Sequence, residues 1–302
     1  MNHHPSKGIF YLCLGVLVFS LQDAIVKYVS AGYPLTEVVF VRSCVAGPIL
    51  LLLVQRVQGW RAIFAARLGM LTLRAFIMLG AYTAYYMAFP ALPLADAVAL
   101  YFTVPLFVTA LAAPVLGEHA GWRVWAAVLL GFGGVMVMLQ PGSGLFEPAA
   151  LLSLLAAALY ALAMLMARKL GQSVSAAVMA FFQNAFFLIG AGVAALLLHW
   201  LGPVQATHPS LSFLVRPWVA LPLYDGLLIA LCGVVAAMGT LLLTSAYRVA
   251  RASVVAPFEY TGILWAPWWG FLFFSEVPRA TTVAGAAVIV VAGLLALRMA
   301  KH

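Results

Sequence analysis

Glu259 is the residue whose chemistry is hardest to reconcile with its neighbours. It stands in the apolar stretch ASVVAPFEYTGILWAPWWGFLFFSE, which covers 252–276. A carboxylate surrounded by hydrocarbon is unfavourable unless it faces water, has a polar partner or is protonated. We therefore predict that Glu259 lines a polar cavity and contacts an amine or a proton. A structural hydrogen bond to a neighbouring helix is the alternative.

Aromatic residues form a second group that could bind a ligand. In MLGAYTAYYMAFPAL, Tyr82, either Tyr85 or Tyr86, and Phe89 fall at helical spacing on one face. Tyr101 occupies the position in the first half of the chain that matches Glu259. A buried tyrosine hydroxyl needs water, a ligand or a protein partner, and aromatic rings can stack on flat or cationic molecules. Ordinary helix packing is the alternative. The aromatic candidates for a binding site are Tyr82, Tyr85, Tyr86, Tyr101, Tyr260 and Trp265.

Two prolines stand close to these polar residues. Pro105 follows Tyr101, and Pro257 precedes Glu259. Proline removes a backbone donor and bends a helix where a cavity can accept the freed carbonyl group. We predict that both prolines act as hinges.

Charged residues also occur inside apolar segments. Asp23 and Lys27 are one helical turn apart, with the acid first, which is the favourable order. Arg42 reaches a similar depth in the next segment. We predict that Asp23 forms a structural ion pair with Lys27 or Arg42; the alternative is that one of these cations binds a ligand carboxylate. Gln183 and Asn184 are further candidates for hydrogen bonds to a ligand.

The composition identifies lipid as the solvent of this chain. Of 302 residues, 66% are hydrophobic and 8% are charged, whereas an average soluble domain has about 25% charged residues. The formal charge of +8 indicates Lys and Arg in cytoplasmic loops rather than a nucleic-acid surface, because no basic run interleaved with aromatic residues occurs. Enzyme and metal-ligand motifs are absent from the sequence, so we expect no catalysis, no metal and no cofactor.

Apolar segments predict an all-α polytopic membrane protein, because a hydrocarbon core needs roughly 20 helical residues per crossing. Ten segments fit, at 9–30, 34–54, 70–90, 94–117, 122–140, 148–170, 176–200, 222–247, 252–275 and 280–299. Lys and Arg gather on one side of this topology, which predicts both termini in the cytoplasm of a bacterial inner membrane. The predicted inner side holds Lys7, Arg56, Arg61, Arg67, Arg74, Arg123, Arg168, Lys169, Arg248, Arg251, Arg298 and Lys301, and the outer side holds Lys27, Arg216 and Arg279.

Two parts of the sequence resemble each other. The stretches at 85–122 and 244–281 each contain a helix end, a tight connection and a long apolar segment closed by Glu118 or Glu276. Five crossings per half turn the second half upside down relative to the first, which is the architecture of secondary transporters with a site between the halves. We predict two inverted five-helix repeats, 1–142 and 143–302, around a central cavity.

The stretches LPLADAVALYFTVPLFVTALAAPVLGE and GWRVWAAVLLGFGGVMVM resemble the drug/metabolite transporter superfamily, and specifically its EamA-type exporters. The resemblance covers essentially the whole chain and implies transport of small organic metabolites. It also implies that Glu118 and Glu276 are structural residues that bind loop backbone or a nearby arginine. FSLQDAIVKYV and PLTEVVFVRS resemble a branch whose members include carriers of riboflavin or S-adenosylmethionine, and the superfamily also contains an aromatic-amino-acid exporter.

We therefore predict a secondary transporter that exports small metabolites by alternating access, with aromatic or hydrophobic amino acids as its substrates. Uptake of riboflavin or S-adenosylmethionine is the first alternative, and a receptor or assembly scaffold without transport is the second. The expected partners are a small-molecule substrate and the lipid bilayer, without nucleic acid, and the expected assembly is a monomer or a homodimer.

Overall fold

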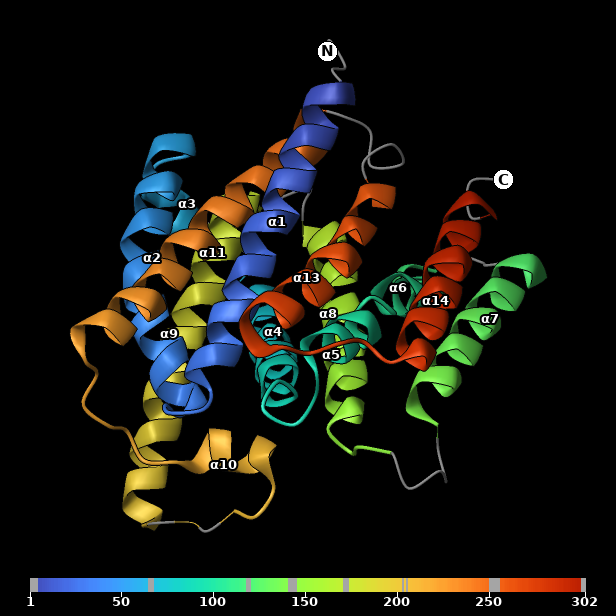
Figure 1. Cartoon of the computed structure of the whole chain (residues 1–302). Helices are drawn as coiled ribbons and strands as arrows, with labels where there is room; N and C mark the ends of the chain where they lie inside the picture. Colours follow the sequence, from blue (N-terminus) through green and yellow to red (C-terminus); the bar gives the residue numbers. More distant parts are fainter. Residues whose placement is uncertain are drawn as a thin grey trace.

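The computed structural model describes residues 5–64, 68–117, 121–140, 146–170, 174–202, 204, 206–249 and 256–299. Within these ranges the chain forms helices joined by turns and loops, without a β-strand (Figure 1). The helices are α1 (Pro5–Val29), α2 (Leu35–Val57), α3 (Arg61–Phe64), α4 (Leu68–Met87), α5 (Leu94–Tyr101), α6 (Val104–Leu116), α7 (Trp122–Leu139), α8 (Ala150–Leu170), α9 (Ala176–Leu201), α10 (Pro209–Val215), α11 (Leu223–Val249), the 3₁₀ helix η1 (Ala256–Thr261), α13 (Gly262–Phe274) and α14 (Ala280–Met299).

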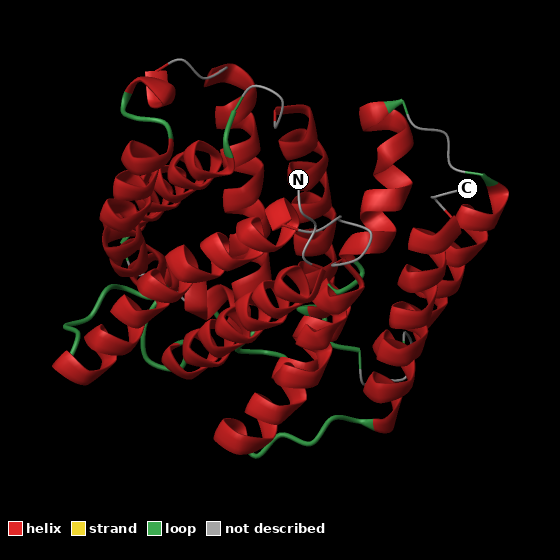
Figure 2. Ribbon diagram, turned by 90° about the horizontal axis from the view of Figure 1, so that it is seen from above, coloured by secondary structure: helices red, strands yellow, loops and turns green. Residues whose placement is uncertain are grey.

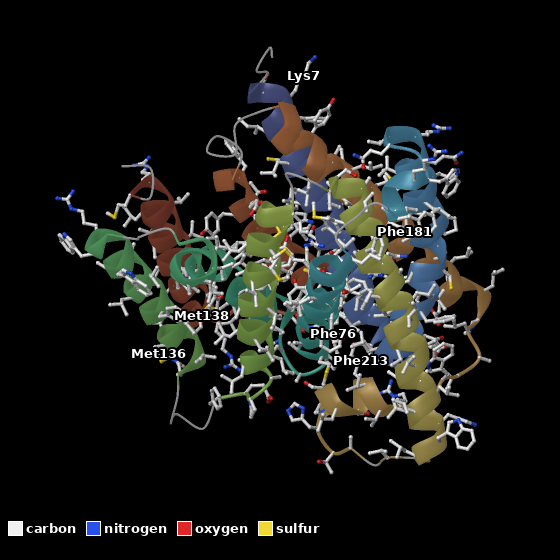
Figure 3. The ribbon with its side chains drawn as sticks, turned by 180° about the vertical axis from the view of Figure 1, so that it is seen from behind. Lys7, Phe76, Met136, Met138, Phe181 and Phe213 are labelled. Carbon is white, nitrogen blue, oxygen red and sulfur yellow. The ribbon has the colours of Figure 1, made fainter. Side chains whose placement is uncertain are left out.

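Among the described helices, α1, α2, α4, α8, α9 and α11 are long and apolar enough to cross a membrane. Shorter apolar helical stretches cover Leu94–Val108, Trp125–Leu139 and Ala280–Leu295. Apolar side chains also cover the outside of the bundle, where Phe76 and Met136 leave 65% and 53% of their surface exposed (Figure 3). Lipid accommodates such an apolar exterior and water does not. The chain is therefore a multi-pass membrane protein.

A helical element lies within each of the ten predicted spans, but the fourth span is interrupted. Span 94–117 breaks at Phe102 and Thr103, between α5 and α6. Pro105 is the second residue of α6 and has no N–H to offer the carbonyl group of Tyr101, so regular α-helical bonding cannot continue across this point. The prediction of one continuous helix here was wrong.

The ninth predicted span, 252–275, is divided as well. Residues 252–255 lie outside the described part of the chain, η1 follows, and α13 begins only at Gly262. Pro257 belongs to η1, as does Glu259. Prolines therefore stand at a helix interruption in both halves of the sequence. Their role as hinges stays a prediction.

Helices from the two halves of the chain pack in matched pairs. α1, the first helix, packs along α11, and α8, the first helix of the second half, packs along α4. The contact of α2 with α11 is matched by that of α9 with α4, while α2 packs on α9 and α7 on α14. Figures 1 and 2 both show α7 and α14 side by side. Gly134 and Gly285 permit this approach, because a Cβ on either would lie 2.8 or 2.6 Å from the carbonyl oxygen of the other.

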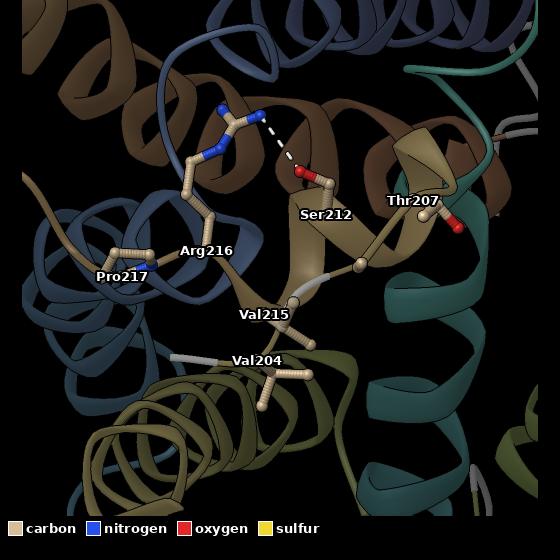
Figure 4. A pocket seen from close by; sticks show the side chains of 7 residues that line it. Val204, Thr207, Ser212, Val215, Arg216 and Pro217 are labelled. Carbon is tan, nitrogen blue, oxygen red and sulfur yellow. Dashed lines mark hydrogen bonds between the residues drawn. The ribbon is translucent and has the colours of Figure 1, made fainter. Parts of the chain in front are cut away.

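The start of α1 and the end of α14 lie at the same end of the bundle (Figure 1). At the opposite end, hydrogen bonds join α10 and its flanking loops to the turn between α1 and α2 and to the start of α2. Arg216 donates to the carbonyl oxygen of Ala31 over 2.8 Å, and Trp218 Nε1 donates to Thr36 Oγ1 over 2.9 Å. Figure 4 shows a pocket here, in which Arg216 also reaches Ser212. The pocket is lined by α10 and its flanking loops, so it is separate from the polar residues inside the bundle.

Candidate functional site

A network of hydrogen bonds joins three tyrosines of α4 to α1 inside the bundle. Gln22 Nε2 donates to the hydroxyls of Tyr82 and Tyr86, over 2.5 and 2.6 Å. Tyr85 donates to Asp23 Oδ2 over 2.9 Å, and Tyr86 donates to Oδ1 over 3.3 Å. The hydroxyls of Tyr82 and Tyr86 are 2.8 Å apart. The three tyrosines predicted from the sequence therefore do lie together, around a carboxylate and an amide.

Arg42 of α2 is the cation of this network. Its guanidinium lies over the rings of Tyr82 and Phe187, at 4.4 and 5.4 Å from their centroids, and Nη1 donates to the Tyr82 hydroxyl. Only 3% of Arg42 is exposed, and its Nε is buried without a hydrogen-bond partner. A guanidinium carries five N–H donors, and among the described residues only the Tyr82 hydroxyl accepts a hydrogen bond from Arg42, so donors remain for a ligand.

The predicted ion pair of Asp23 with Lys27 or Arg42 is absent from the described structure. Asp23 is held by tyrosine hydroxyls of α4, whereas Lys27, one turn further along α1, has a different partner. Lys27 Nζ lies 2.5 Å from Glu276 Oε1 and donates to the carbonyl oxygen of Leu92 over 2.7 Å. The ion-pair prediction was wrong because the partner of Lys27 comes from the far end of the sequence.

Glu276 connects the two halves of the chain at the end of the bundle opposite to the start of α1. Its Oε2 accepts the N–H of Leu94 over 2.9 Å, while Oε1 holds Lys27. Glu276 thus binds a backbone N–H and a cation, but the N–H belongs to the first residue of α5 and the cation is a lysine and not an arginine. Its structural role stays a prediction. Glu118, the other glutamate in that prediction, lies outside the described residues.

Tyr101 of α5 extends the tyrosine cluster toward α8 and η1. Its ring centroid lies 4.5 Å from that of Tyr85 and 5.6 Å from that of Tyr160. The Glu259 carboxylate interacts electrostatically with the hydroxyls of Tyr101 and Tyr160, and its side chain is partly exposed. The structure thus places Tyr101 and Glu259 beside the cluster; their contact with a substrate stays a prediction.

Tyr260 and Trp265 have other neighbours. Tyr260 is buried beside Phe102, with ring centroids 6.0 Å apart, and Trp265 stacks on Trp269 along α13 at 6.5 Å. Neither Tyr260 Oη nor Trp265 Nε1 has a hydrogen-bond partner among the described residues. Both side chains pack against aromatic rings and do not join the hydrogen-bonded network around Asp23.

Gln183 and Asn184 of α9 form hydrogen bonds to two different helices. Asn184 Nδ2 donates to the carbonyl oxygen of Ser43 in α2 over 3.0 Å. Gln183 Oε1 accepts a bond of 3.4 Å from Nη1 of Arg74 in α4. Neighbours in the sequence therefore contribute to two separate contacts, and only Gln183 reaches a charged group.

Arg74, which the predicted topology places on the inner side, is buried in the structure. Only 7% of it is exposed, and its Nε donates to the carbonyl oxygen of Ala163 in α8 over 3.2 Å. α4 begins at Leu68, so Arg74 lies more than a turn inside the helix. Arg74 was not among the predicted site residues, and its place on the inner side stays a prediction. Gln22 and Tyr160 were also not among the predicted candidates. Both are polar groups in otherwise apolar helices, and that signal alone could have identified them.

Comparison with known proteins assigns this chain to a family. The model of the EamA-like transporter family matches residues 6–140. The pseudopaline exporter CntI of Pseudomonas aeruginosa (strain UCBPP-PA14) is 34% identical, with 98% of this chain and 97% of that protein aligned. The chain belongs to the EamA-like transporter family. It is thereby a member of the drug/metabolite transporter superfamily, as the sequence motifs predicted.

Other EamA-like relatives are named for different compounds. The S-adenosylmethionine uptake transporter of Rickettsia prowazekii is 26% identical over 98% of this chain and 94% of its own length. The riboflavin transporter of Vibrio cholerae (strain El Tor Inaba N16961) is 28% identical over 96% of this chain and 92% of its own. A crystal structure with 16% identity superimposes with a TM-score of 0.63 over 98% of both chains, which shows a shared fold.

The relatives of this chain are named as transporters, so the question for this arrangement is what it could bind. Among the described residues, no group of His, Cys, Asp and Glu is suited to hold a metal ion. The network instead offers a buried cation with unused donors, a carboxylate kept apart from it by tyrosine hydroxyls, and several aromatic rings. These groups can hold a molecule that carries both signs of charge and an apolar part.

Proposed function

We propose that this chain is a secondary transporter that exports small metabolites by alternating access. In this proposal residues 1–142 and 143–302 form two inverted five-helix repeats around a central cavity. The packing of α1 on α11 and of α8 on α4 supports the architecture, because exchanging the two repeats converts one of these contacts into the other. Rocking of one repeat against the other would open the central site to each side in turn.

We further propose that both termini lie in the cytoplasm of a bacterial inner membrane. The start of α1 and the end of α14 share one end of the bundle, where Lys7 lies, whereas α10, which Arg216 follows, lies at the other (Figures 1 and 3). An excess of Lys and Arg favours the cytoplasmic side. Reporter fusions to each terminus test this orientation, and a periplasmic signal from either one would contradict it.

For the substrate we propose aromatic and hydrophobic amino acids. The observation that carries this proposal is that Arg42 and Asp23 share one tyrosine network without pairing with each other. An amino acid supplies a carboxylate for the unused donors of Arg42 and an ammonium group for Asp23. The rings of Tyr82 and Tyr85 would contact its side chain. The similarity to a Pseudomonas exporter supports the outward direction of transport.

Counterflow in liposomes tests the substrate proposal. Purified protein is reconstituted into liposomes preloaded with unlabelled phenylalanine, tryptophan or leucine, and the same amino acid is added outside in labelled form at low concentration. We expect transient accumulation of label in these liposomes and none in protein-free or unloaded ones. If no amino acid of a broad panel accumulates, the substrate proposal is lost.

Uptake of riboflavin or S-adenosylmethionine is the second candidate function. It is supported by the similarity to carriers named for these compounds and by the adjacent aromatic rings of Tyr85 and Tyr101, which could contact a flat molecule. Expression of this chain in a strain auxotrophic for either compound tests it. Growth rescue at low external concentration, together with no amino-acid counterflow, would favour this candidate. A receptor or scaffold would give neither result.

A further inference from the structure

A second buried arginine lies near the first. Arg42 is 3% exposed and Arg74 is 7% exposed. Within the described part of the chain, neither guanidinium lies within ion-pair distance of a carboxylate; the ion pairs found there join Lys27 to Glu276 and His208 to Glu147. Two cations inside a membrane protein are unfavourable unless an anion compensates their charge.

Both arginines face the contact between α4 and α9. Arg74 Nη1 donates to Gln183, and the Arg42 guanidinium lies over Phe187, one turn or about 6 Å further along α9. On α4, Arg74 and Tyr82, the tyrosine that Arg42 contacts, are about 12 Å apart. The residues that the two guanidinium groups contact are therefore about 6–12 Å apart along these helices, and we take this as the scale of the separation between the two cations.

Hydrogen-bonding capacity remains on both cations. Arg42 Nε is buried without a partner, and so is Oε1 of Gln22, which belongs to the same network. Arg74 donates from Nε to Ala163 and makes a long bond of 3.4 Å to Gln183, and it donates no further hydrogen bond to the described residues. Each guanidinium can therefore still bind a carboxylate, and the free Gln22 oxygen can accept from an ammonium group.

We propose that the preferred substrate is an amino acid with a second, distal carboxylate, and that Arg42 and Arg74 each bind one of its two carboxylates. This inference rests on the proposed transport of amino acids, and it replaces the hydrophobic side chain of that proposal by one that ends in a carboxylate. The two carboxylates would lie about 6–12 Å apart, so that both guanidinium groups are neutralised when the site is loaded. A molecule with one carboxylate leaves one cation uncompensated and is transported less well.

A homologous series of substrates tests this proposal. Liposomes containing the purified protein are loaded with aspartate, glutamate, 2-aminoadipate, 2-aminopimelate or 2-aminosuberate, and export is followed by mass spectrometry. Norvaline and norleucine serve as monocarboxylates of comparable chain length. We expect the longer dicarboxylates to leave about tenfold faster than norleucine, because a hydrogen bond to a charged group contributes this much or more. Aspartate, whose carboxylates are close together, should be exported little faster than norvaline or norleucine.

Substitutions of Arg74 test whether this residue causes the preference for dicarboxylates. Arg74→Gln should bring the ratio of dicarboxylate to monocarboxylate export close to one, while norleucine is still exported. Arg74→Lys should keep part of the preference, because it keeps the charge. Arg56→Gln, which removes an exposed cation at the end of α2, should leave the ratio unchanged. The ratio compares two substrates in the same preparation, so a smaller fraction of folded protein does not affect it.

Every outcome of these export measurements either supports or contradicts the proposed preference for dicarboxylates. A preference that appears in the wild type and disappears in Arg74→Gln supports the inference. Amino-acid export without any preference for a dicarboxylate overturns it and leaves the proposed function intact. A preference that survives in Arg74→Gln also overturns it. No export of any compound overturns both proposals.

Discussion

Buried charges are arranged in two different ways in two regions of this molecule. At the end opposite to the start of α1, Lys27 and Glu276 form an ion pair with Nζ and Oε1 2.5 Å apart. Inside the bundle, Arg42 and Asp23 contact tyrosine hydroxyls and leave their charges unpaired. Paired charges contribute mainly to holding segments together, whereas unpaired ones are available to a ligand. The two regions should therefore respond oppositely to substitution.

The paired region joins segments that are far apart in the sequence. Lys27 comes from α1, and Glu276 follows α13. The carbonyl group of Leu92 lies in the turn before α5, and the N–H of Leu94 belongs to the first residue of α5. The pair thus links both proposed repeats at one end of the bundle. In an alternating-access cycle, this end can open only when Lys27 and Glu276 separate. The unpaired region should instead be neutralised by the substrate.

Arg42→Gln should cause the largest effect and confine it to transport. Loss of a charged hydrogen bond to a bound carboxylate costs about 2–5 kcal/mol, which weakens apparent affinity by about 30-fold or more. The melting temperature in detergent should not fall, because the substitution removes an uncompensated buried charge. Counterflow and thermal unfolding measure the two effects, with Arg56→Gln as the control. Normal counterflow in Arg42→Gln would contradict the inference that the unpaired charges inside the bundle serve to bind the substrate.

Lys27→Met should act mainly on stability. It leaves Glu276 without its cation, and breaking a buried pair costs about 3–5 kcal/mol. Because the side chain of Glu276 is 26% exposed, we expect about 1–3 kcal/mol, seen as a lower melting temperature in detergent. The double variant Lys27→Met/Glu276→Gln should recover part of the loss. If the two substitutions are simply additive, the pair does not stabilise the fold.

Asp23→Asn should weaken transport by about tenfold, the effect of one charged contact. The amide removes the charge that would hold a substrate ammonium group. The apparent affinity for amino acids should therefore fall, whereas the affinity for matching acids without an amine, such as 3-phenylpropionate for phenylalanine, should not change. Competition of both compounds against labelled phenylalanine counterflow measures this difference. Equal weakening of both would assign Asp23 a structural role beside Tyr85.

The helical elements could be predicted from the sequence because lipid imposes a length on every crossing. The predicted spans 34–54 and 176–200 agree with α2 and α9 to within a few residues. The interruption at Phe102 could not be predicted, since proline in an apolar segment is compatible with a bend or a full break. The packing of α5 and α6 against α8 decides between them.

Polar residues of the site could be recognised from the sequence, but their partners could not. Helical spacing suggested Asp23 as the ion-pair partner of Lys27. The observed partner, Glu276, is distant in the sequence and is brought close to Lys27 by tertiary packing. The tyrosines of α4 were recognised from their helical spacing in an apolar segment. Arg74 was missed because it was counted only among the cations of the inner side, although it lay inside the predicted span 70–90.

Tyr33→Phe should give the smallest effect, again in the paired region. The Tyr33 hydroxyl, in the turn between α1 and α2, donates to Asp225 Oδ2, and this hydrogen bond to the carboxylate raises the pKa of Tyr33 from 10.0 to about 12. A phenol whose pKa is raised by folding stabilises the folded state below pH 10.0, and this contribution is lost as the pH rises through about 12. The wild type should therefore lose slightly more thermal stability than Tyr33→Phe across this pH window. Equal losses would mean that this end is held by Lys27, Glu276 and the backbone contacts of Arg216, without help from Tyr33.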